Sequence, residues 1–153
     1  MTEQAKVAKH CRAYLRSIGV KGSVTSKSYA GGENVRIYVQ DQHPKTMGQI
    51  KKELAKYQYG SFNPYEDIYE NGNLIDGLPQ VKFLFIENDM SDDMYKKVYT
   101  FVHKETNSDL PVNYDDVSPS EPFADTHIQN FLYRVMVGGE KGLQEKFWAQ
   151  IGS

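Results

Sequence analysis

The chain has 153 residues, of which 39% are hydrophobic and 25% charged; this composition excludes an intrinsically disordered protein and fits one globular domain, or one domain with an extension. Its single cysteine, Cys11, excludes an internal disulfide and favours a reducing compartment. The net charge of −2 hides an asymmetry, because residues 1–57 hold 11 basic and 4 acidic residues, whereas residues 58–153 hold 7 and 16.

The first predicted element is an amphipathic helix over residues 4–18, because apolar side chains recur there at helical spacing on one face. Cys11 lies in this apolar stripe, so we interpret it as a small core residue rather than a nucleophile. A β-hairpin is predicted next, with strands over residues 23–29 and 35–40 around the glycine pair 31–32, since hairpin turns need positive φ angles. The residues predicted to be buried here are Val7, Cys11, Tyr14, Leu15, Ile18, Val35, Ile37 and Val39.

A second helix is predicted over residues 46–57, with Thr46 and Gln49 as a capping box. Residues 59–79 contain Asn-Pro, Asn-Gly and Asp-Gly turn signals, and we interpret them as a structured loop with a short helical turn near residues 65–69. The side chains that this second helix is predicted to bury are Met47, Ile50, Leu54 and Tyr57.

The segment VKFLFI, residues 81–86, is the clearest candidate for a buried strand. A third helix is predicted to begin at Ser91, whose hydroxyl can cap its first turn. Residues 107–125 hold three of the six prolines and are interpreted as an ordered loop or linker. The inward-pointing residues predicted for the third helix are Tyr95, Val98 and Val102.

Two helices are predicted at the end of the chain. The first begins near Thr126, with Gln129 as its capping partner, and stops at the glycine pair 138–139. The second covers residues 140–151. The residues that the first helix is predicted to bury are Ile128, Phe131, Leu132, Val135 and Met136. The second presents an apolar stripe of Leu143, Phe147, Trp148 and Ile151, and its Trp148 could belong to the core or to an interface.

The element order α-β-β-α-β-α, followed by two C-terminal helices, predicts an α+β fold with helices packed on one face of a small, mainly antiparallel sheet. We expect residues 1–106 to form the α+β domain. Residues 107–153 would supply the proline-rich connection and the helical pair, packed on the same core. The alternative is that the C-terminal helices hold another chain and form a homo-oligomer.

Motifs for catalysis, for cofactors and for metals are missing from the sequence. The four histidines are scattered, and no phosphate-binding loop, dinucleotide fingerprint or nucleophile elbow occurs. We therefore expect no enzyme, no cofactor and no metal. One alternative stays open, because Glu87, Asp89 and Asp92 follow a buried strand and could bind Mg²⁺ in a nuclease. The other explanation for these carboxylates, and for Asp93 beside them, is that they cap a helix and are solvated.

The hairpin is the best candidate for a binding surface. Lys27, Tyr29, Arg36 and Tyr38 alternate with the buried residues, so they would share the exposed face. Cations among aromatic rings can neutralise phosphate and stack on bases, which predicts contact with nucleic acid or with a protein partner. The alternative is a solvated sheet face with cross-strand pairs, or one covered by the C-terminal helices.

A second candidate surface is the loop PYEDIYENGN. Its acidic and aromatic side chains could contact a partner protein, or they could belong to a polar surface loop that its aromatic residues anchor. The residues proposed for this partner-binding loop are Tyr65, Glu66, Asp67, Tyr69 and Glu70.

Three segments carry a resemblance to a known family. The most specific is the pattern S-x-S-Y-x-G-G before a β-strand, and FNPYEDIYENGN and VKFLFIENDMSDD follow it. Over roughly residues 5–93 the chain resembles the twenty-ninth type of large polyvalent protein-associated domain, which is found in phages and conjugative elements. The resemblance implies a mobile genetic element as the source and a role beside entering DNA or against host defences. It supplies no catalytic residues. The residues that match the pattern are Ser26, Ser28, Tyr29, Gly31 and Gly32.

Our main hypothesis is a phage- or mobile-element-encoded anti-defence protein that inhibits a host nucleic-acid-handling complex, a CRISPR effector or a restriction system, by direct binding. Its acidic half could replace phosphates in a basic groove of that host protein or nucleoprotein complex. The alternative is a nucleic-acid-binding accessory protein that uses the hairpin face. No run of 18 apolar residues and no signal peptide occurs, so we expect a cytoplasmic protein of the host cell without membrane contact.

Overall fold

The chain folds into two compact units, and each has a hydrophobic core of its own. The computed structural model describes residues 1–63, 68–70 and 74–151. The first unit consists of Met1–Gln40 and Thr46–Asp89, and the second of Asp41–Lys45 and Met90–Ser153. The second unit is therefore discontinuous in sequence, because five of its residues, Asp41–Lys45, lie between two parts of the first unit. The last two of them, Pro44 and Lys45, begin a helix.

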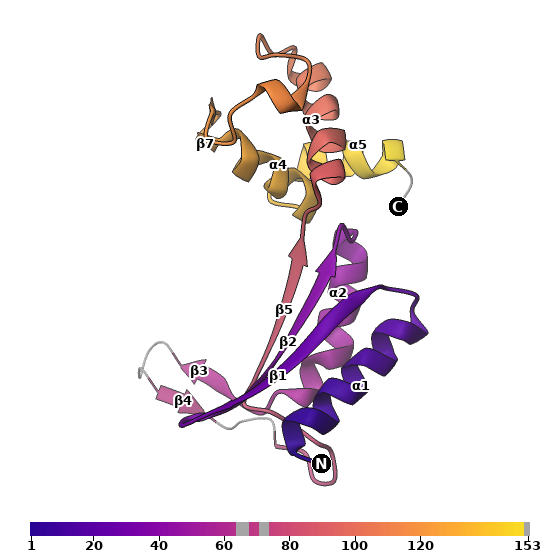
Figure 1. The fold of residues 1–153 in the computed structure, drawn as a ribbon, viewed down its shortest axis with the longest axis vertical. Helices are drawn as coiled ribbons and strands as arrows, with labels where there is room; N and C mark the ends of the chain where they lie inside the picture. Colours follow the sequence, from indigo (N-terminus) through magenta and orange to yellow (C-terminus); the bar gives the residue numbers. More distant parts are fainter. Residues whose placement is uncertain (64–67, 71–73, 152–153) are drawn as a thin grey trace. The chain divides into compact units, whose positions relative to one another are not determined.

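The first unit contains two long helices, a three-stranded sheet and a small two-stranded sheet (Figure 1). Its strand order is β1-β2-β5, with β1 antiparallel to β2 and β2 parallel to β5. The parallel pairing arises because a helix returns the chain before β5 begins. The predicted α+β class is confirmed. The elements are α1 (Glu3–Ser17), β1 (Gly22–Tyr29), β2 (Gly32–Gln40), α2 (Pro44–Leu54), the 3-10 helix η1 (Ala55–Tyr57), β3 (Ser61–Asn63), β4 (Ile68–Glu70) and β5 (Phe83–Asp89).

Helices α1 and α2 lie on the same side of the three-stranded sheet (Figure 1). Every second residue of β2 from Val35 to Val39 is buried against them, as the predicted alternation requires. Neighbouring strands extend this face with Val24, Leu84 and Ile86. Cys11 is fully buried in the same core, in agreement with its interpretation as a core residue. The core consists of Val7, Ala8, Cys11, Leu15, Val24, Val35, Ile37, Val39, Met47, Ile50, Leu54, Tyr57 and Val81.

The start of α2 differs from the prediction. The helix begins at Pro44, and the ring Nδ1 of His43 accepts the backbone N–H of Lys45 at 2.9 Å. The proposed capping box of Thr46 and Gln49 is therefore wrong. Proline is favoured in the first turn because its fixed φ angle suits a helix and its missing N–H would have no helical partner there.

The region between α2 and β5 also differs in part. Ile68–Glu70 form strand β4 and pair with β3, so a helical turn does not extend through these residues. The remainder of the proposed turn, residues 65–67, lies outside the described residues. Strand β5 begins at Phe83 and continues to Asp89, whereas the prediction ended it at residue 86.

The second unit packs three helices around a core rich in aromatic side chains. Phe101 of α3 meets Phe147 of α5 with 5.6 Å between ring centroids, and Phe147 meets Trp148 at 5.4 Å. The indole N–H of Trp148 donates to the carbonyl of Met136 at 3.0 Å, so this buried polar group is satisfied. The elements are α3 (Asp92–Thr106), the 3-10 helix η2 (Tyr114–Asp116), β6 (Pro122–Phe123), β7 (Thr126–His127), α4 (Ile128–Val137) and α5 (Lys141–Ile151).

Helix α3 belongs to the second unit, so the chain divides at residues 89 and 90 rather than at 106 and 107. Val98, Phe101 and Val102 are buried among residues of α4 and α5, and they form a core separate from that of the sheet. This finding differs from the expected single shared core. The physical reason is that an amphipathic helix packs on whichever apolar surface is complementary to it, and sequence periodicity does not identify that surface.

The caps of α3 and α4 illustrate one success and one error. Ser91 caps α3 as predicted, and its hydroxyl accepts the N–H of Met94 at 3.1 Å. The predicted cap of α4 at Thr126 is wrong, because His127 occupies that position and accepts the N–H of Asn130. Thr126 pairs with Phe123 in the β6–β7 hairpin, which delays the start of the helix.

Candidate functional site

The face of the sheet opposite α1 and α2 collects the residues predicted from the hairpin. Side chains that are directly opposite in a sheet share a face, and successive residues alternate between faces. Val24 pairs with Ile37 on the helix side, so Thr25 and its partner Arg36 point to the other side. By the same alternation, Lys27, Tyr29, Arg36 and Tyr38 share one face, as the sequence predicts.

Strand β5 adds two phenylalanines to this face. Phe85 pairs with Arg36, and Phe83 pairs with Asn34. Leu84 and Ile86 point to the helices, so the strand that was predicted to be buried has one side against the helices and one side facing away from them. We call the surface that faces away from α1 and α2 the open face and define it by Lys27, Tyr29, Arg36, Tyr38, Phe83, Phe85 and Glu87.

Phe83 and Phe85 are not among the predicted site residues, because residues 81–86 were predicted to form a buried strand. The alternation of aromatic and aliphatic side chains from residue 83 to residue 86 is the signal that could have identified them.

Arg36 lies at the centre of the open face. Its guanidinium carbon lies 4.5 Å from the centroid of the Phe85 ring, and its Nη1 lies 3.2 Å from Oε1 of Glu87. The side chains of Arg36 and Glu87 are 41% and 44% exposed, so water screens this ion pair. The Phe85 ring thus holds the planar guanidinium against the sheet, while the weak ion pair can exchange for another anion.

The open face presents aromatic surface to solvent. Phe85 is 38% exposed and Tyr29 is 42% exposed, both high values for large rings on a sheet. The rings of Phe83 and Phe85 have centroids 6.0 Å apart and an interplanar angle of 28°, so they are roughly parallel. Exposed rings beside cations can bind flat, anionic ligands by stacking and by charge.

The proposed partner-binding loop is described only in part. Tyr65, Glu66 and Asp67 lie outside the described residues. Tyr69 and Glu70 lie in β4, where their backbones pair with Phe62 and Ser61 of β3. Contact of this loop with a partner protein therefore remains a prediction.

The structure gives two of the carboxylates that were considered for a magnesium site, Glu87 and Asp92, a role in an ion pair and in a helix turn. Glu87 pairs with Arg36, and Asp92 lies in the first turn of α3. Over residues 1–63, 68–70 and 74–151, no three His, Cys, Asp or Glu side chains gather in a group that could hold a metal ion. Burial raises the pKa of the Cys11 thiol to about 12, which keeps it protonated at neutral pH.

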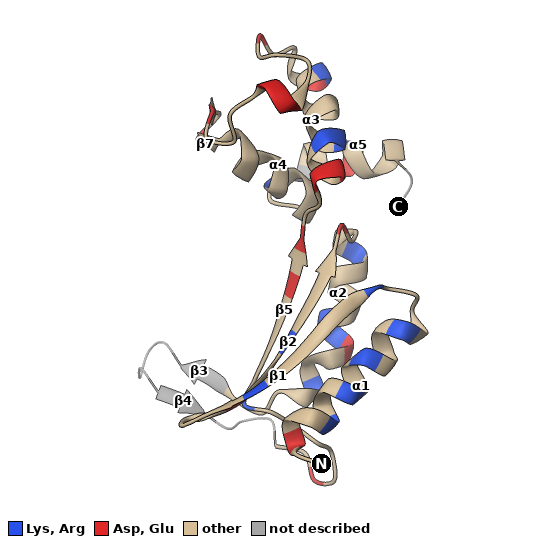
Figure 2. Ribbon diagram, in the orientation of Figure 1, with Lys and Arg blue, Asp and Glu red and all other residues tan. Residues whose placement is uncertain are grey.

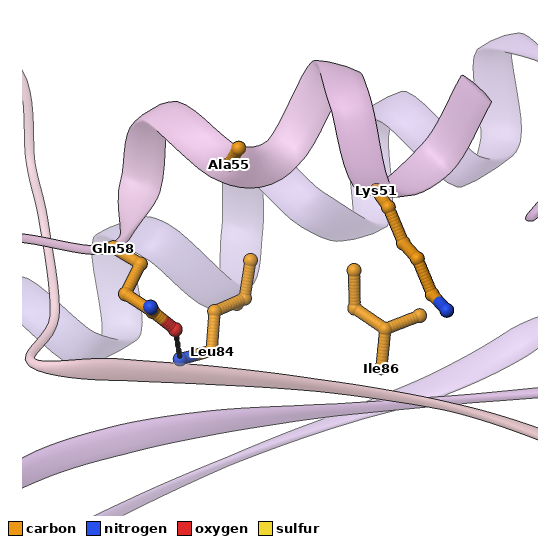
Figure 3. Close-up of a pocket in the computed structure, with 5 residues that line it drawn as sticks. All are labelled: Lys51, Ala55, Gln58, Leu84 and Ile86. Atoms are coloured by element: carbon orange, nitrogen blue, oxygen red, sulfur yellow. Dashed lines mark hydrogen bonds between the residues drawn. The ribbon is translucent and has the colours of Figure 1, made fainter. Parts of the chain in front are cut away.

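A small pocket lies on the helix side of the sheet, between α2, η1 and β5 (Figure 3). Its volume is about 250 Å³, and Leu84 and Ile86 form the apolar part of its wall. The side chain of Gln58 crosses one end, where its Oε1 accepts the N–H of Leu84 at 2.8 Å. Since a side chain of the same unit already pairs with this strand edge, the pocket is a weaker candidate site than the open face. Its lining residues are Lys51, Ala55, Gln58, Leu84 and Ile86.

Comparison with family models, with curated proteins and with solved structures found no match to this chain. The resemblance of residues 5–93 to a phage-associated domain therefore remains a prediction from the motifs. None of the helices in the described residues is long and apolar enough to cross a membrane.

Proposed function

We propose that the first unit binds single-stranded nucleic acid on the open face of its sheet. The observation that supports this proposal is that Arg36, Tyr38 and Phe85 share one side of the sheet. Arg36 lies over the Phe85 ring there, on a surface that faces away from α1 and α2. Unpaired bases expose their flat surfaces and can stack on such rings, whereas bases in a duplex are stacked on each other.

The charges of the first unit support the same function. Figure 2 shows Lys and Arg along α1 and α2 and on β1. On the open face itself, Lys27 and Arg36 would neutralise phosphates that follow the stacked bases. Glu87 would give up its exposed pair with Arg36 on binding, which costs little because such pairs contribute about 0–1 kcal/mol.

Fluorescence anisotropy of a labelled single-stranded oligonucleotide tests the proposal. Phe85→Leu keeps an apolar side chain and removes the π surface, so it separates stacking from general hydrophobic contact. We expect Phe85→Leu and Tyr38→Ala each to weaken binding, with a loss of about 1–3 kcal/mol for each stacked base. Val112→Ala is the matched control, because Val112 is an exposed apolar residue of the second unit.

Two outcomes would contradict this proposal. One is the absence of binding to single-stranded DNA and RNA at low salt. The other is binding that neither open-face substitution changes. A labelled duplex of the same length serves as a comparison, and we expect it to bind more weakly than the single strand.

A second candidate function is the inhibition of a host defence complex by a phage or mobile element. The observation that favours it is the charge of the second unit, where 11 Asp and Glu stand against 7 Lys and Arg. Asp115 and Asp116 of η2 and Asp92 and Asp93 of α3 are among these carboxylates. Acidic side chains could occupy a basic groove that normally receives nucleic acid.

A plating assay tests this second candidate. The protein is produced in cells that carry a restriction or CRISPR system, and plaques of a targeted phage are counted. We expect restored plaque numbers, and fewer plaques with Asp115→Asn and Asp116→Asn combined. Unchanged plaque numbers in all tested systems would contradict inhibition. A pull-down with and without nuclease then shows whether a captured complex is held directly or through nucleic acid.

A further inference from the structure

A pocket with three cations lies where the end of α1 turns into β1. Its volume is about 280 Å³. Arg12, Arg16 and Lys21 supply half of its wall, and the residues that line it include no acidic side chain. Its lining residues are Arg12, Leu15, Arg16, Val20, Lys21 and Gly22.

The cations of this pocket are not needed to cap α1. The backbone N–H groups of Ile18, Gly19 and Val20 donate to the carbonyls of Tyr14, Arg16 and Leu15, at 3.2, 3.2 and 2.9 Å. Three of the last four carbonyls of the helix are therefore satisfied by the backbone itself. Within the described part of the chain, no carboxylate forms an ion pair with Arg12, Arg16 or Lys21. Three positive charges thus remain available to an anion.

The walls of the pocket are held in place. The Nη2 of Arg12 donates to the carbonyl of Val24 at 2.8 Å, which orients the guanidinium along the first residues of β1. Gly22 is packed so closely that a Cβ there would lie 2.6 Å from the carbonyl oxygen of Tyr38. A fixed guanidinium beside a close-packed backbone loses little conformational entropy when it binds an anion.

The pocket lies on the helix side of the sheet, at its edge strand. β1 is an edge strand of the sheet, and Gly22 is its first residue. The following residue, Ser23, pairs with Tyr38 of the open face. A strand of nucleic acid with a base against Tyr38 would have to cross the edge strand β1 to contact Arg16 and Lys21 on the helix side.

We propose that Arg12, Arg16 and Lys21 bind a phosphate group, and that this group belongs to the backbone of the single strand held on the open face. Guanidinium groups match the oxygens of phosphate with paired hydrogen bonds, and the lysine adds a point charge. This inference rests on the proposed function, because the phosphate source is the polynucleotide. Free inorganic phosphate has the same oxygens and is the other source that the pocket could accept.

The test uses the full chain and two probes, a labelled single-stranded oligonucleotide and inorganic phosphate. Arg16→Ala and Lys21→Ala are combined, whereas Arg12 is left intact because it also holds Val24. Lys52→Ala is the control, since it removes one exposed cation from α2 of the same unit. Thermal unfolding by circular dichroism verifies that each variant is folded.

We expect the double variant to weaken oligonucleotide binding. The slope of log affinity against log salt should fall by about 0.7 for each phosphate that the protein no longer neutralises, while Lys52→Ala leaves the slope unchanged. An unchanged slope in the double variant, with binding still weakened in Phe85→Leu, overturns this inference and leaves the proposed function standing. No oligonucleotide binding by the unmodified chain overturns both.

The titration with inorganic phosphate shows whether the pocket binds a backbone phosphate of the oligonucleotide or free phosphate. Inorganic phosphate is titrated while the amide NMR signals of Val20, Lys21 and Gly22 are recorded. Shifts that the oligonucleotide reproduces at lower concentration support the backbone assignment. Shifts with inorganic phosphate alone, together with unchanged oligonucleotide binding in the double variant, overturn it in favour of a free-phosphate site.

Discussion

The carboxylate of Asp41 accepts two hydrogen bonds from Ser91, one from its backbone N–H at 2.8 Å and one from its hydroxyl at 2.5 Å. Ser91 is the cap of α3, so Asp41 supports the cap from outside the helix. Asp41 has a φ angle of 57°, which few residues other than glycine, asparagine and aspartate adopt. A residue directly after β2 thus stabilises a helix whose cap lies 50 residues later.

We expect Asp41→Ala to destabilise the second unit by about 1–3 kcal/mol, because it removes two hydrogen bonds to a carboxylate. Alanine is also unfavourable at a positive φ angle. Urea unfolding followed by the fluorescence of Trp148 measures the loss, since the single tryptophan is buried in this unit. Asp41→Asn keeps an acceptor and tolerates the backbone, so its loss should be smaller. Equal stability of all three proteins would contradict the role of Asp41.

Two glycines of the first unit should respond in opposite directions to alanine. Gly48 lies in α2 with open space where a Cβ would be, so Gly48→Ala should stabilise the chain by roughly 0.5–1 kcal/mol. A Cβ on Gly60 would lie 2.5 Å from the carbonyl oxygen of Lys82, so Gly60→Ala should destabilise by about 1–3 kcal/mol. Urea unfolding followed by circular dichroism measures both changes. Stabilisation by both substitutions would show that the backbone does not approach Gly60 so closely.

Cys11 should resist thiol reagents until the first unit unfolds. Its pKa of about 12 leaves roughly one thiol in ten thousand ionised at pH 8, and its side chain is fully buried. We expect Ellman's reagent to react slowly with the native chain and rapidly in concentrated urea. Rapid reaction of the native chain, at the rate of a free thiol, would place Cys11 outside the core.

The raised pKa of Cys11 also has a consequence for stability in alkali. The folded pKa lies above the ordinary value of 9.0, so the stabilisation is complete below pH 9 and is lost as pH rises toward 12. Urea midpoints at pH 7 and pH 10 measure this loss. Cys11→Ala is the comparison, because it keeps the titration of the other groups, and its midpoint should fall less between the two pH values.

Arg134 connects two carboxylates of the second unit, Asp125 and Glu140. Its hydrogen bond lowers the pKa of Asp125, so the contribution of this pair is present at neutral pH and is lost as pH falls through that lowered value. Arg134→Gln should return the pKa of Asp125 toward 3.8, as a carbon-detected NMR titration would record. Lys146→Gln breaks the pair with Glu105 and should leave Asp125 unchanged.

Local patterns in the sequence predicted the helices and most of the residues that each buries. Ile18 and Ile151, at the ends of two predicted apolar stripes, are exposed instead. The stripe of Met47, Ile50 and Leu54 on α2 and the stripe of α4 are both buried as expected. The alternation in β2 likewise placed Arg36 and Tyr38 on the open face. These predictions succeeded because periodicity is a property of one segment and does not depend on distant partners.

Features that depend on distant residues were not predicted. The parallel pairing of β2 with β5 makes Phe85 a neighbour of Arg36, although 49 positions separate them in the sequence. The choice of α3 between two cores likewise depends on the shape of both surfaces. The cap of α4 moved to His127 because a short strand pair took Thr126, and strand propensity alone does not reveal such a pair.

The second unit consists of two separate segments of the sequence, and this limits which parts of the gene can be moved by recombination. A segment that encodes residues 90–153 omits Asp41, which supports the cap of α3, and His43, whose ring lies 4.8 Å from that of Trp148. Recombination that moved this segment into another gene would therefore separate it from part of its own structure. A fusion that carries residues 41–153 restores those residues but also imports α2 and β5. The two units are consequently expected to be inherited together, as one cassette.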